Sequence, residues 1–216
     1  MDPYIEPNLS KSAVITIDVQ NDFSLPGAVA EIKGTNEVIP QMKAMLELCR
    51  KKQIPIIHVI RIYKEDGSNA DICRREKIAS GFQMVSPGSA GAELVDAIKP
   101  SDSKKLDYEN LLAGEVQPIG PLEWAMYKPR WGAFYQTRLE SFLRARGVDT
   151  LIFMGCNFPN CPRTSIYEAS ERDFKVAMVK DAVSGVYDRG IQEMQNIGVR
   201  VYAADQIMEE IERAGN

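Results

Sequence analysis

Three residues whose side chains could carry out hydrolysis follow short apolar segments of the chain. Asp18 and Lys128 each end such a segment, and Cys161 comes shortly after another, TLIFMG (150–155). A thiol becomes a strong nucleophile when a neighbour accepts its proton and a positive charge stabilises the thiolate. Asp18 can take this proton and return it to a departing amine, while Lys128 stabilises the thiolate and holds the carboxylate. The combination suits hydrolysis of an amide through a thioester.

Two of the four cysteines lie close together, in GCNFPNCPRTS (155–165). Pro162 has no backbone N–H and suits the first turn of a helix, so we expect Cys161 to be the helix N-cap. Unpaired N–H groups and the positive end of the helix dipole there favour a thiolate. Cys156 directly follows a buried segment, where cysteine acts as a small apolar side chain. We therefore expect Cys161 to be the nucleophile and Cys156 to pack in the core.

The spacing of the cysteines gives less support to a metal site or a redox site. Structural zinc sites combine a C-x2-4-C pair with a second pair of ligands, and the one histidine, His58, lies inside an apolar run. A thiol redox protein that uses Cys156 and Cys161 stays open as an alternative, although C-x-x-C is absent. No G-x-G-x-x-G or Walker pattern follows a predicted strand. We expect neither a metal nor a cofactor.

Composition limits the classes of protein to consider. The chain has 216 residues, 44% of them hydrophobic, and a net charge of −4, which is typical of a globular protein and argues against a nucleic-acid partner. The N-terminal sequence lacks the pattern of a secretory signal, and no apolar run reaches the length that spans a membrane. We expect one domain over residues 1–216, with a core at about 11–205, in the cytoplasm and without a membrane partner.

Short apolar runs alternate with amphipathic stretches along the chain. The runs predict strands at residues 13–18, 54–63, 123–128, 150–155, 174–182 and 198–203. The amphipathic stretches predict helices at residues 36–53, 137–147, 162–173 and 188–198. This alternation predicts an α/β fold, three-layer and Rossmann-like, around a six-stranded parallel sheet. Ligands bind beyond the carboxyl ends of such strands, which is where the acid, the lysine and the thiol collect.

Three segments at these strand ends form family motifs, namely DVQNDF (18–23), KPRWGAFYQTRL (128–139) and GCNFPNCPRTSIYEASERDF (155–174). With GSAGAELV (88–95), they make the chain resemble the isochorismatase-like cysteine hydrolase superfamily, in the amidohydrolase branch related to N-carbamoylsarcosine amidohydrolase and nicotinamidase. The resemblance runs from about residue 11 to 205. Each motif alone is moderately specific, whereas three in order are strongly specific.

The resemblance implies a role for each of these residues. Asp18 would be the general base and acid, Lys128 the third member of a catalytic triad and Cys161 the nucleophile. The family has a cis peptide bond before the nucleophile, which here would be Cys156–Asn157. The resulting oxyanion hole would consist of the backbone N–H groups of Asn157 and Cys161, aimed at the developing negative oxygen.

Two departures from the family pattern bear on the substrate. Nicotinamidases place metal-binding histidines after the second strand, and the segment there, RIYKEDGSNADICRREK (61–77), contains no histidine. We therefore expect a metal-independent enzyme that does not act on nicotinamide. Isochorismatases that cleave a vinyl ether generally lack the cysteine, so Cys161 argues against that activity. Phe158 and Pro159 also replace polar residues near the substrate.

The substrate-binding residues are predicted from their positions beside the motifs. Phe23, Trp131 and Phe158 are candidates for the pocket wall, and Arg163 for pairing with a substrate carboxylate. Four basic residues after the second strand are further candidates for that pairing, namely Arg61, Lys64, Arg74 and Arg75. The function expected is hydrolysis of a small linear amide, carbamoyl or ureido compound with release of ammonia, by a homodimer or homotetramer. A non-catalytic scaffold protein with the same fold is the other alternative.

Overall fold

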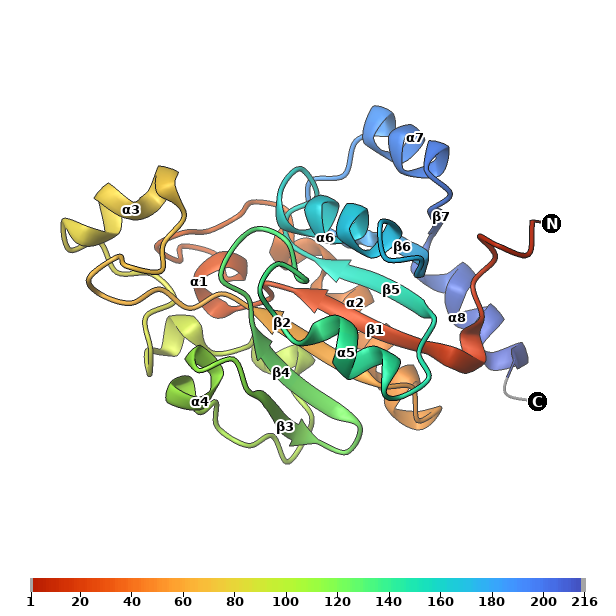
Figure 1. The fold of residues 1–216 in the computed structure, drawn as a ribbon, viewed down its shortest axis with the longest axis horizontal. Coiled ribbons are helices and arrows are strands. Elements are labelled where there is room, and N and C mark those ends of the chain that lie inside the picture. The colour runs from red at the N-terminus through yellow and green to blue at the C-terminus, as the bar shows by residue number, and fades with distance from the viewer. Residues whose placement is uncertain (1, 215–216) are drawn as a thin grey trace.

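The computed structural model describes residues 2–214, which fold around a seven-stranded sheet of order β3-β4-β2-β1-β5-β6-β7 (Figure 1). Its strands are β1 (Ser12–Ile17), β2 (Ile56–Ile60), β3 (Val116–Gly120), β4 (Glu123–Tyr127), β5 (Thr150–Gly155), β6 (Lys175–Val183) and β7 (Arg200–Tyr202). Neighbouring strands are parallel except β3, which is antiparallel to β4. The prediction of six parallel strands is therefore wrong in number. It missed β3, a half-exposed edge strand that contains Pro118 and has no apolar run.

Helices cover both faces of the sheet, which gives three layers. The α-helices are α1 (Asn21–Ser24), α2 (Thr35–Lys51), α3 (Ile72–Ala79), α4 (Tyr108–Leu112), α5 (Leu139–Arg144), α6 (Cys161–Ser170), α7 (Asp188–Asn196) and α8 (Ala204–Ala214). Short 3-10 helices are η1 (Leu9–Lys11), η2 (Ala90–Ala92) and η3 (Asp96–Ile98). One core layer holds side chains of α2, α4 and α8, and the other holds those of α5, α6 and α7. The predicted helices correspond to α2, α5, α6 and α7, and α8 was not among them.

The central strand β1 shows why near-continuous apolar runs form this sheet. Its side chains alternate between the two layers: Val14 packs in the layer of α2 and α8, and Ala13, Ile15 and Ile17 pack in the layer of α5 and α6. Both faces of the strand are thus buried, as is usual for parallel strands covered by helices.

The strand order places a topological switch point beside β1. From β1 the chain continues on one side, through β2 to β4, and returns on the other side of β1 with β5. Helices that leave two adjacent strands in opposite directions leave a crevice outside their carboxyl ends. The carboxyl ends of β1 and β5 carry Asp18 and the turn that leads to Cys161.

A third core cluster lies at this edge of the sheet. It joins the segment between β2 and β3 to α1 and to the turn after β5, and its buried members are Phe23, Tyr63, Ala70, Ile78, Met84, Val85, Ala92 and Cys156. The segment between β2 and β3 therefore covers the strand ends.

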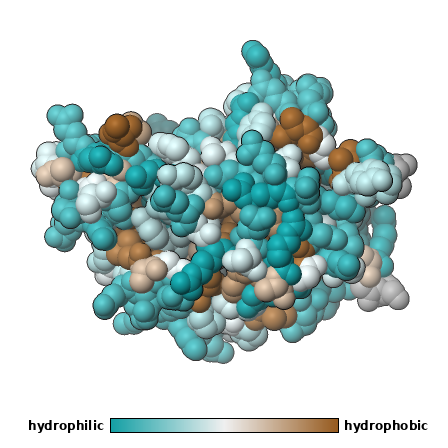
Figure 2. All heavy atoms as spheres, in the orientation of Figure 1, coloured by the Kyte–Doolittle hydropathy of each residue, from teal (hydrophilic) through white to brown (hydrophobic). Residues whose placement is uncertain are grey.

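The surface seen in Figure 2 is largely hydrophilic, with apolar side chains in separate small groups. Scattered apolar side chains of this kind are normal on a folded protein. Within residues 2–214, every helix is too short or too polar to cross a bilayer.

Candidate active site

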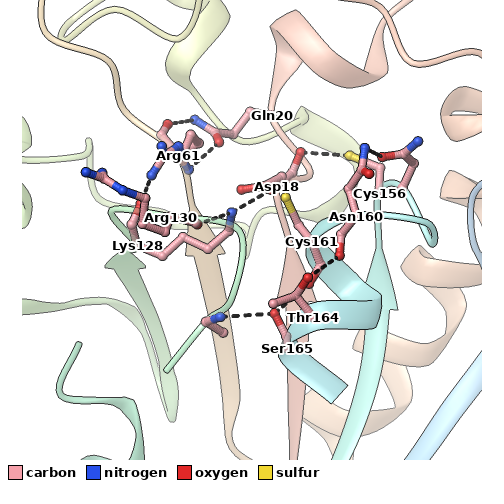
Figure 3. A network of polar contacts seen from close by, with 12 residues as sticks. Asp18, Gln20, Arg61, Lys128, Arg130, Cys156, Asn160, Cys161, Thr164 and Ser165 are labelled. Atoms are coloured by element: carbon pink, nitrogen blue, oxygen red, sulfur yellow. Dashed lines mark hydrogen bonds and ion pairs between the residues drawn. The ribbon is translucent and has the colours of Figure 1, made fainter. Parts of the chain in front are cut away.

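The three strand ends bring Asp18, Lys128 and Cys161 together. Asp18 directly follows β1, Lys128 directly follows β4, and Cys161 is the first residue of α6. The Nζ atom of Lys128 lies 2.9 Å from Oδ2 of Asp18, and Figure 3 shows the Cys161 thiol beside this pair. The three residues are buried, with exposed fractions of 4%, 0% and 7%. A carboxylate, a lysine and a thiol thus lie together in one site that is largely shielded from water.

The backbone around Asp18 turns sharply at the end of β1. Asp18 has a φ of 56°, a left-handed conformation that aspartate adopts more readily than most residues. Its carbonyl oxygen accepts hydrogen bonds from the Gln20 N–H at 2.8 Å and from the Cys156 thiol at 3.1 Å. Cys156 is 1% exposed and packs in the third cluster. Its thiol therefore holds the backbone of Asp18.

The position of Cys161 in its helix differs from the prediction. Asn160 is the N-cap and Cys161 is the first helical residue, with Pro162 behind it in the first turn. The prediction of Cys161 as N-cap is thus wrong by one residue. Proline is tolerated anywhere in the first turn because the N–H groups there lack helical partners, so it marks the start of a helix only approximately.

The protonation of the thiol also differs from the prediction. Burial first, and then the Asp18 carboxylate, raise the pKa of Cys161 to about 12, although Lys128 acts in the opposite direction. The sequence argument considered only the helix terminus, whereas burial is the larger effect. The resting site therefore holds a protonated thiol.

Lys128 is charged in the same site. Burial acts to lower the pKa of Lys128, but the neighbouring Asp18 carboxylate favours the charged form, and the pKa is raised. Its Nζ also donates to the backbone carbonyl of Arg130 at 3.1 Å. A protonated thiol beside a carboxylate that is paired with a lysine suits general-base activation of the nucleophile at the moment of attack.

Two residues that line the same site have backbone N–H groups without a backbone acceptor in the described loops and turns. The Cys156–Asn157 peptide bond is cis, as the resemblance implies. Among residues 2–214, the backbone N–H groups of Asn157 and Cys161 donate to no backbone acceptor outside regular helices and strands. Both residues line the cavity beside the thiol. The two groups are therefore suitable donors for an oxygen bound there.

The cavity beside the thiol is small. It has a volume of about 20 Å³ and is lined by Asp18, Phe23, Ile32, Arg74, Trp131, Cys156, Asn157, Asn160 and Cys161. Larger hollows of about 550 and 590 Å³ lie near β7 and the N-terminal segment, away from the triad. The smaller cavity is the relevant one because the thiol opens into it. It has room for about one water molecule, so a substrate must displace part of its wall.

The structure separates the four predicted substrate-binding residues into two pairs. Phe23 and Trp131 line the cavity. Phe158 is fully buried and packs edge-to-face on Tyr187, with ring centroids 5.5 Å apart. Arg163 donates to Glu193 at 2.6 Å. Neither Phe158 nor Arg163 belongs to the cavity wall formed by the described residues.

A hydrogen-bonded network supports the backbone of Lys128, and it contains Arg61, which the sequence suggested as a partner of a substrate carboxylate but which is bonded within the protein instead. The buried Arg61 donates from Nη1 to the Lys128 carbonyl at 2.7 Å and from Nη2 to Oδ2 of Asp71 at 2.7 Å. Gln20 exchanges two hydrogen bonds with the Arg61 backbone, each 2.8 Å long. The sequence feature that could have pointed to Gln20 is its position inside the motif DVQNDF (18–23).

Ser165 connects α6, the helix that begins with Cys161, to the loop after Lys128. Its hydroxyl donates to the Cys161 carbonyl at 2.7 Å and accepts from the Ala133 N–H at 3.0 Å (Figure 3). This buried bridge joins the second and third sequence motifs, so it holds the loop that carries Trp131 against α6. A serine within a helix gives no such signal in the sequence alone.

Metal ligands are not grouped at the position where nicotinamidases are expected to have them. Among residues 2–214, no three His, Cys, Asp or Glu side chains are placed to hold a metal ion. After β2, the carboxylate of Asp71 is instead bonded to Arg61 and to the Tyr63 hydroxyl, both at 2.7 Å. A guanidinium and a phenol are not a suitable donor set for a divalent metal.

Known proteins resemble this chain in sequence and in fold. The family model described as Isochorismatase domain matches residues 12–107 and 110–206. A probable inactive nicotinamidase of Arabidopsis thaliana is 31% identical over 208 residues, which are 93% of this chain and 96% of that protein. The N-carbamoylsarcosine amidase of an Arthrobacter species is 26% identical, over 93% of this chain and 71% of its own. The crystal structure of an isochorismatase family protein from Desulfovibrio vulgaris matches with a TM-score of 0.80 and 30% identity, covering 94% of this chain and 99% of that one.

Proposed function

The chain belongs to the isochorismatase family, and from this premise we propose that it is a metal-independent cysteine amidohydrolase. The substrate class is a small linear amide, carbamoyl or ureido compound, and the products include ammonia. The observation that carries the proposal is the buried ion pair of Lys128 and Asp18, 2.9 Å long, beside the Cys161 thiol. The similarity to an N-carbamoylsarcosine amidase supports the substrate class.

In the first half of the proposed reaction, Asp18 takes the proton of the Cys161 thiol as the sulfur attacks the carbonyl carbon. The oxygen of the tetrahedral intermediate accepts hydrogen bonds from the N–H groups of Asn157 and Cys161. Asp18 then gives its proton to the leaving nitrogen, ammonia departs, and a thioester remains on Cys161.

In the second half, water attacks the thioester and Asp18 takes its proton. The carbon–sulfur bond breaks, the acid product leaves, and the proton returns from Asp18 to Cys161. The sum is one amide and one water converted to one acid and one ammonia. Lys128 stays charged and holds the carboxylate in place during both halves.

The experiment is a screen for ammonia release from small amides, carbamoyl acids and ureido acids. We expect release by the wild type and by Cys73→Ser, which removes an exposed thiol on α3. The Cys161→Ser variant should lose at least about 10²-fold in rate, because a hydroxyl is a far weaker nucleophile here. A wild-type rate that survives Cys161→Ser would reject the proposal.

A non-catalytic protein with this fold is the second candidate, favoured by the Arabidopsis relative whose name describes a probable inactive enzyme. It predicts that folded wild-type protein releases no ammonia from any compound of the panel. A thiol count with and without reductant tests the redox alternative in the same samples, since a disulfide between Cys156 and Cys161 would remove two thiols.

A further inference from the structure

Arg74 is the one arginine or lysine that lines the cavity beside Cys161 in the described part of the chain. The other basic candidates are engaged elsewhere or exposed. Arg61 is buried against Asp71, and Arg163 pairs with Glu193. Lys64 and Arg75 are exposed. Position therefore singles out Arg74 among the predicted partners of a substrate carboxylate.

The Arg74 guanidinium is held in place while most of its donors stay available. It stacks on Trp131 with 4.8 Å from Cζ to the ring centroid, and Nη1 donates to the Tyr63 hydroxyl at 2.7 Å. This is its one hydrogen bond to the residues that the structure describes. A guanidinium has five N–H donors in a plane, and a carboxylate can accept two of them side by side. A stacked guanidinium presents its edge for such a contact.

The charges around Arg74 leave one positive charge without a counterion. The cluster contains two guanidinium groups, Arg61 and Arg74, and one carboxylate, Asp71. Asp71 accepts from Arg61 and from the Tyr63 hydroxyl, and burial raises the pKa of Tyr63, so the phenol stays neutral. Within residues 2–214, no carboxylate lies within ion-pair distance of Arg74, and the nearby Asp18 is already paired with Lys128. An anion at Arg74 would balance the cluster.

We propose that Arg74 binds a carboxylate of the substrate, so that the enzyme selects short amides or carbamoyl compounds that carry a negative charge. The inference rests on the proposed function and names its substrate class. Cys161 and Arg74 line the same cavity of about 20 Å³, which implies a short spacer between the scissile carbonyl and the carboxylate. The apolar side chains of Phe23, Ile32 and Trp131 suit such a spacer. N-carbamoyl amino acids and short amidic acids have this chemistry.

The proposal is tested without turnover by comparing two reagents that alkylate Cys161. Iodoacetate and iodoacetamide have nearly the same size, and each forms a carbon–sulfur bond and releases iodide; only iodoacetate carries a carboxylate. The readout is the ratio of the two rates at Cys161, measured by mass spectrometry of the peptide that contains it. In Arg74→Gln we expect the ratio of the iodoacetate rate to the iodoacetamide rate to fall by about tenfold.

Matched variants separate charge recognition from structural damage. Arg75→Gln removes the neighbouring charge on α3 and should leave the ratio unchanged, whereas Arg74→Lys should restore part of it. An unchanged ratio in Arg74→Gln would overturn the proposal. Equal slowing of both reagents is one form of this result, and it would assign Arg74 a structural role only.

Turnover gives a second, separate readout. N-carbamoylglycine carries a carboxylate, whereas its methyl ester has no negative charge at that position. We expect Arg74→Gln to raise KM for the acid by about tenfold or more while kcat/KM for the ester stays the same. Equal losses of kcat/KM for acid and ester would contradict the proposal that Arg74 binds the substrate carboxylate. Absence of ammonia release from every compound would count against the proposed function, and the alkylation ratio would still decide whether Arg74 recognises carboxylates.

Discussion

At the scale of the residue, the Asp18 carboxylate acts on both of its neighbours in the site, Lys128 and Cys161. It pairs with Lys128 at 2.9 Å and keeps that lysine charged in a fully buried position. It also helps burial to raise the pKa of Cys161 to about 12. In the proposed mechanism, the thiol is therefore protonated at rest and passes its proton to Asp18 as it attacks the substrate.

This dual role predicts opposite effects of Asp18→Asn on two quantities: the reactivity of the Cys161 thiol should increase, and the rate of ammonia release should decrease. Loss of the carboxylate should lower the Cys161 pKa, so its alkylation by iodoacetamide should begin at lower pH than in the wild type. Ammonia release should fall by about 10²–10⁴-fold because the proposed general base and acid is gone. The measurement is the pH profile of alkylation at Cys161, together with the rate of ammonia release.

Cys73 provides the control for this prediction within the same chain, since its exposed thiol should show the same profile in both proteins. Circular dichroism checks that the variant folds despite the unpaired Lys128. An alkylation profile at Cys161 that stays where it is in the wild type would contradict the assignment of Asp18 as a cause of the raised pKa.

At the scale of the element, the ends of β1 and β5 lie so close together that a side chain at Gly155 would not fit between them. Gly155 ends β5 with a φ of 122°, beside Ile17 at the end of β1. A Cβ atom on Gly155 would lie 2.3 Å from the Ile17 carbonyl oxygen. The Cys156 N–H donates to that same oxygen at 2.9 Å. A glycine here allows β1 to lie close enough to β5 for the Cys156 turn to reach Asp18.

We therefore expect Gly155→Ala to destabilise the protein and to disturb the site. The matched control is Gly114→Ala, where φ is also positive, at 88°, but no atom lies within 4 Å of the new Cβ. Both variants carry backbone strain, so the steric conflict alone should cost Gly155→Ala about 1–3 kcal/mol more in the free energy of unfolding. Urea unfolding of the two variants measures the difference. Equal losses would show that the strand ends can move apart freely.

The same strand ends show how far sequence reasoning reaches. Asp18, Lys128 and Cys161 were chosen as candidates because each comes at or shortly after the end of a predicted buried strand, and local patterns identify such strands. Other features depend on contacts between distant segments. The edge strand β3 has no apolar run and forms only against β4. Arg74 reaches the cavity because the segment between β2 and β3 folds over the strand ends, and the Cys161 pKa is set by burial. No local pattern contains this information.

At the scale of the whole molecule, a buried polar network joins a helix layer to the sheet. Arg50 of α2 donates to both carboxylate oxygens of Glu123, at 2.9 and 2.7 Å. His58 of β2 bonds to Glu123 at 2.7 Å and to Thr16 of β1 at 2.7 Å. Burial acts to raise the pKa of Glu123, but the bonds from Arg50 and His58 hold it below its ordinary value.

Replacement of Glu123 by glutamine should destabilise the protein by about 2–3 kcal/mol, because Arg50 loses its charged partner. A carboxyl group whose pKa is lowered on folding stabilises the folded state above its unfolded pKa, and this stabilisation is lost as pH falls through the folded pKa. The difference between wild type and variant should thus be constant at neutral pH and shrink below about pH 4.

Unfolding by urea at several pH values measures this difference. Glu115→Gln is the control, since Glu115 and its partner Arg138 are exposed on the surface and their ion pair contributes little. A difference between wild type and Glu123→Gln that grows as the solution becomes acidic would contradict the direction of the Glu123 pKa shift.

The two outer strands of the sheet have a consequence for the behaviour of the protein at high concentration. An open sheet edge can recruit a strand from another molecule and so begin cross-β aggregation. Here β3 carries Pro118, which has no N–H to offer a further strand, and β7 has only three residues, with Arg200 bonded to Glu6 at 2.8 Å. Neither edge offers a long, regular row of backbone donors and acceptors. The same strands that complete the sheet thus keep it from serving as a template for fibres.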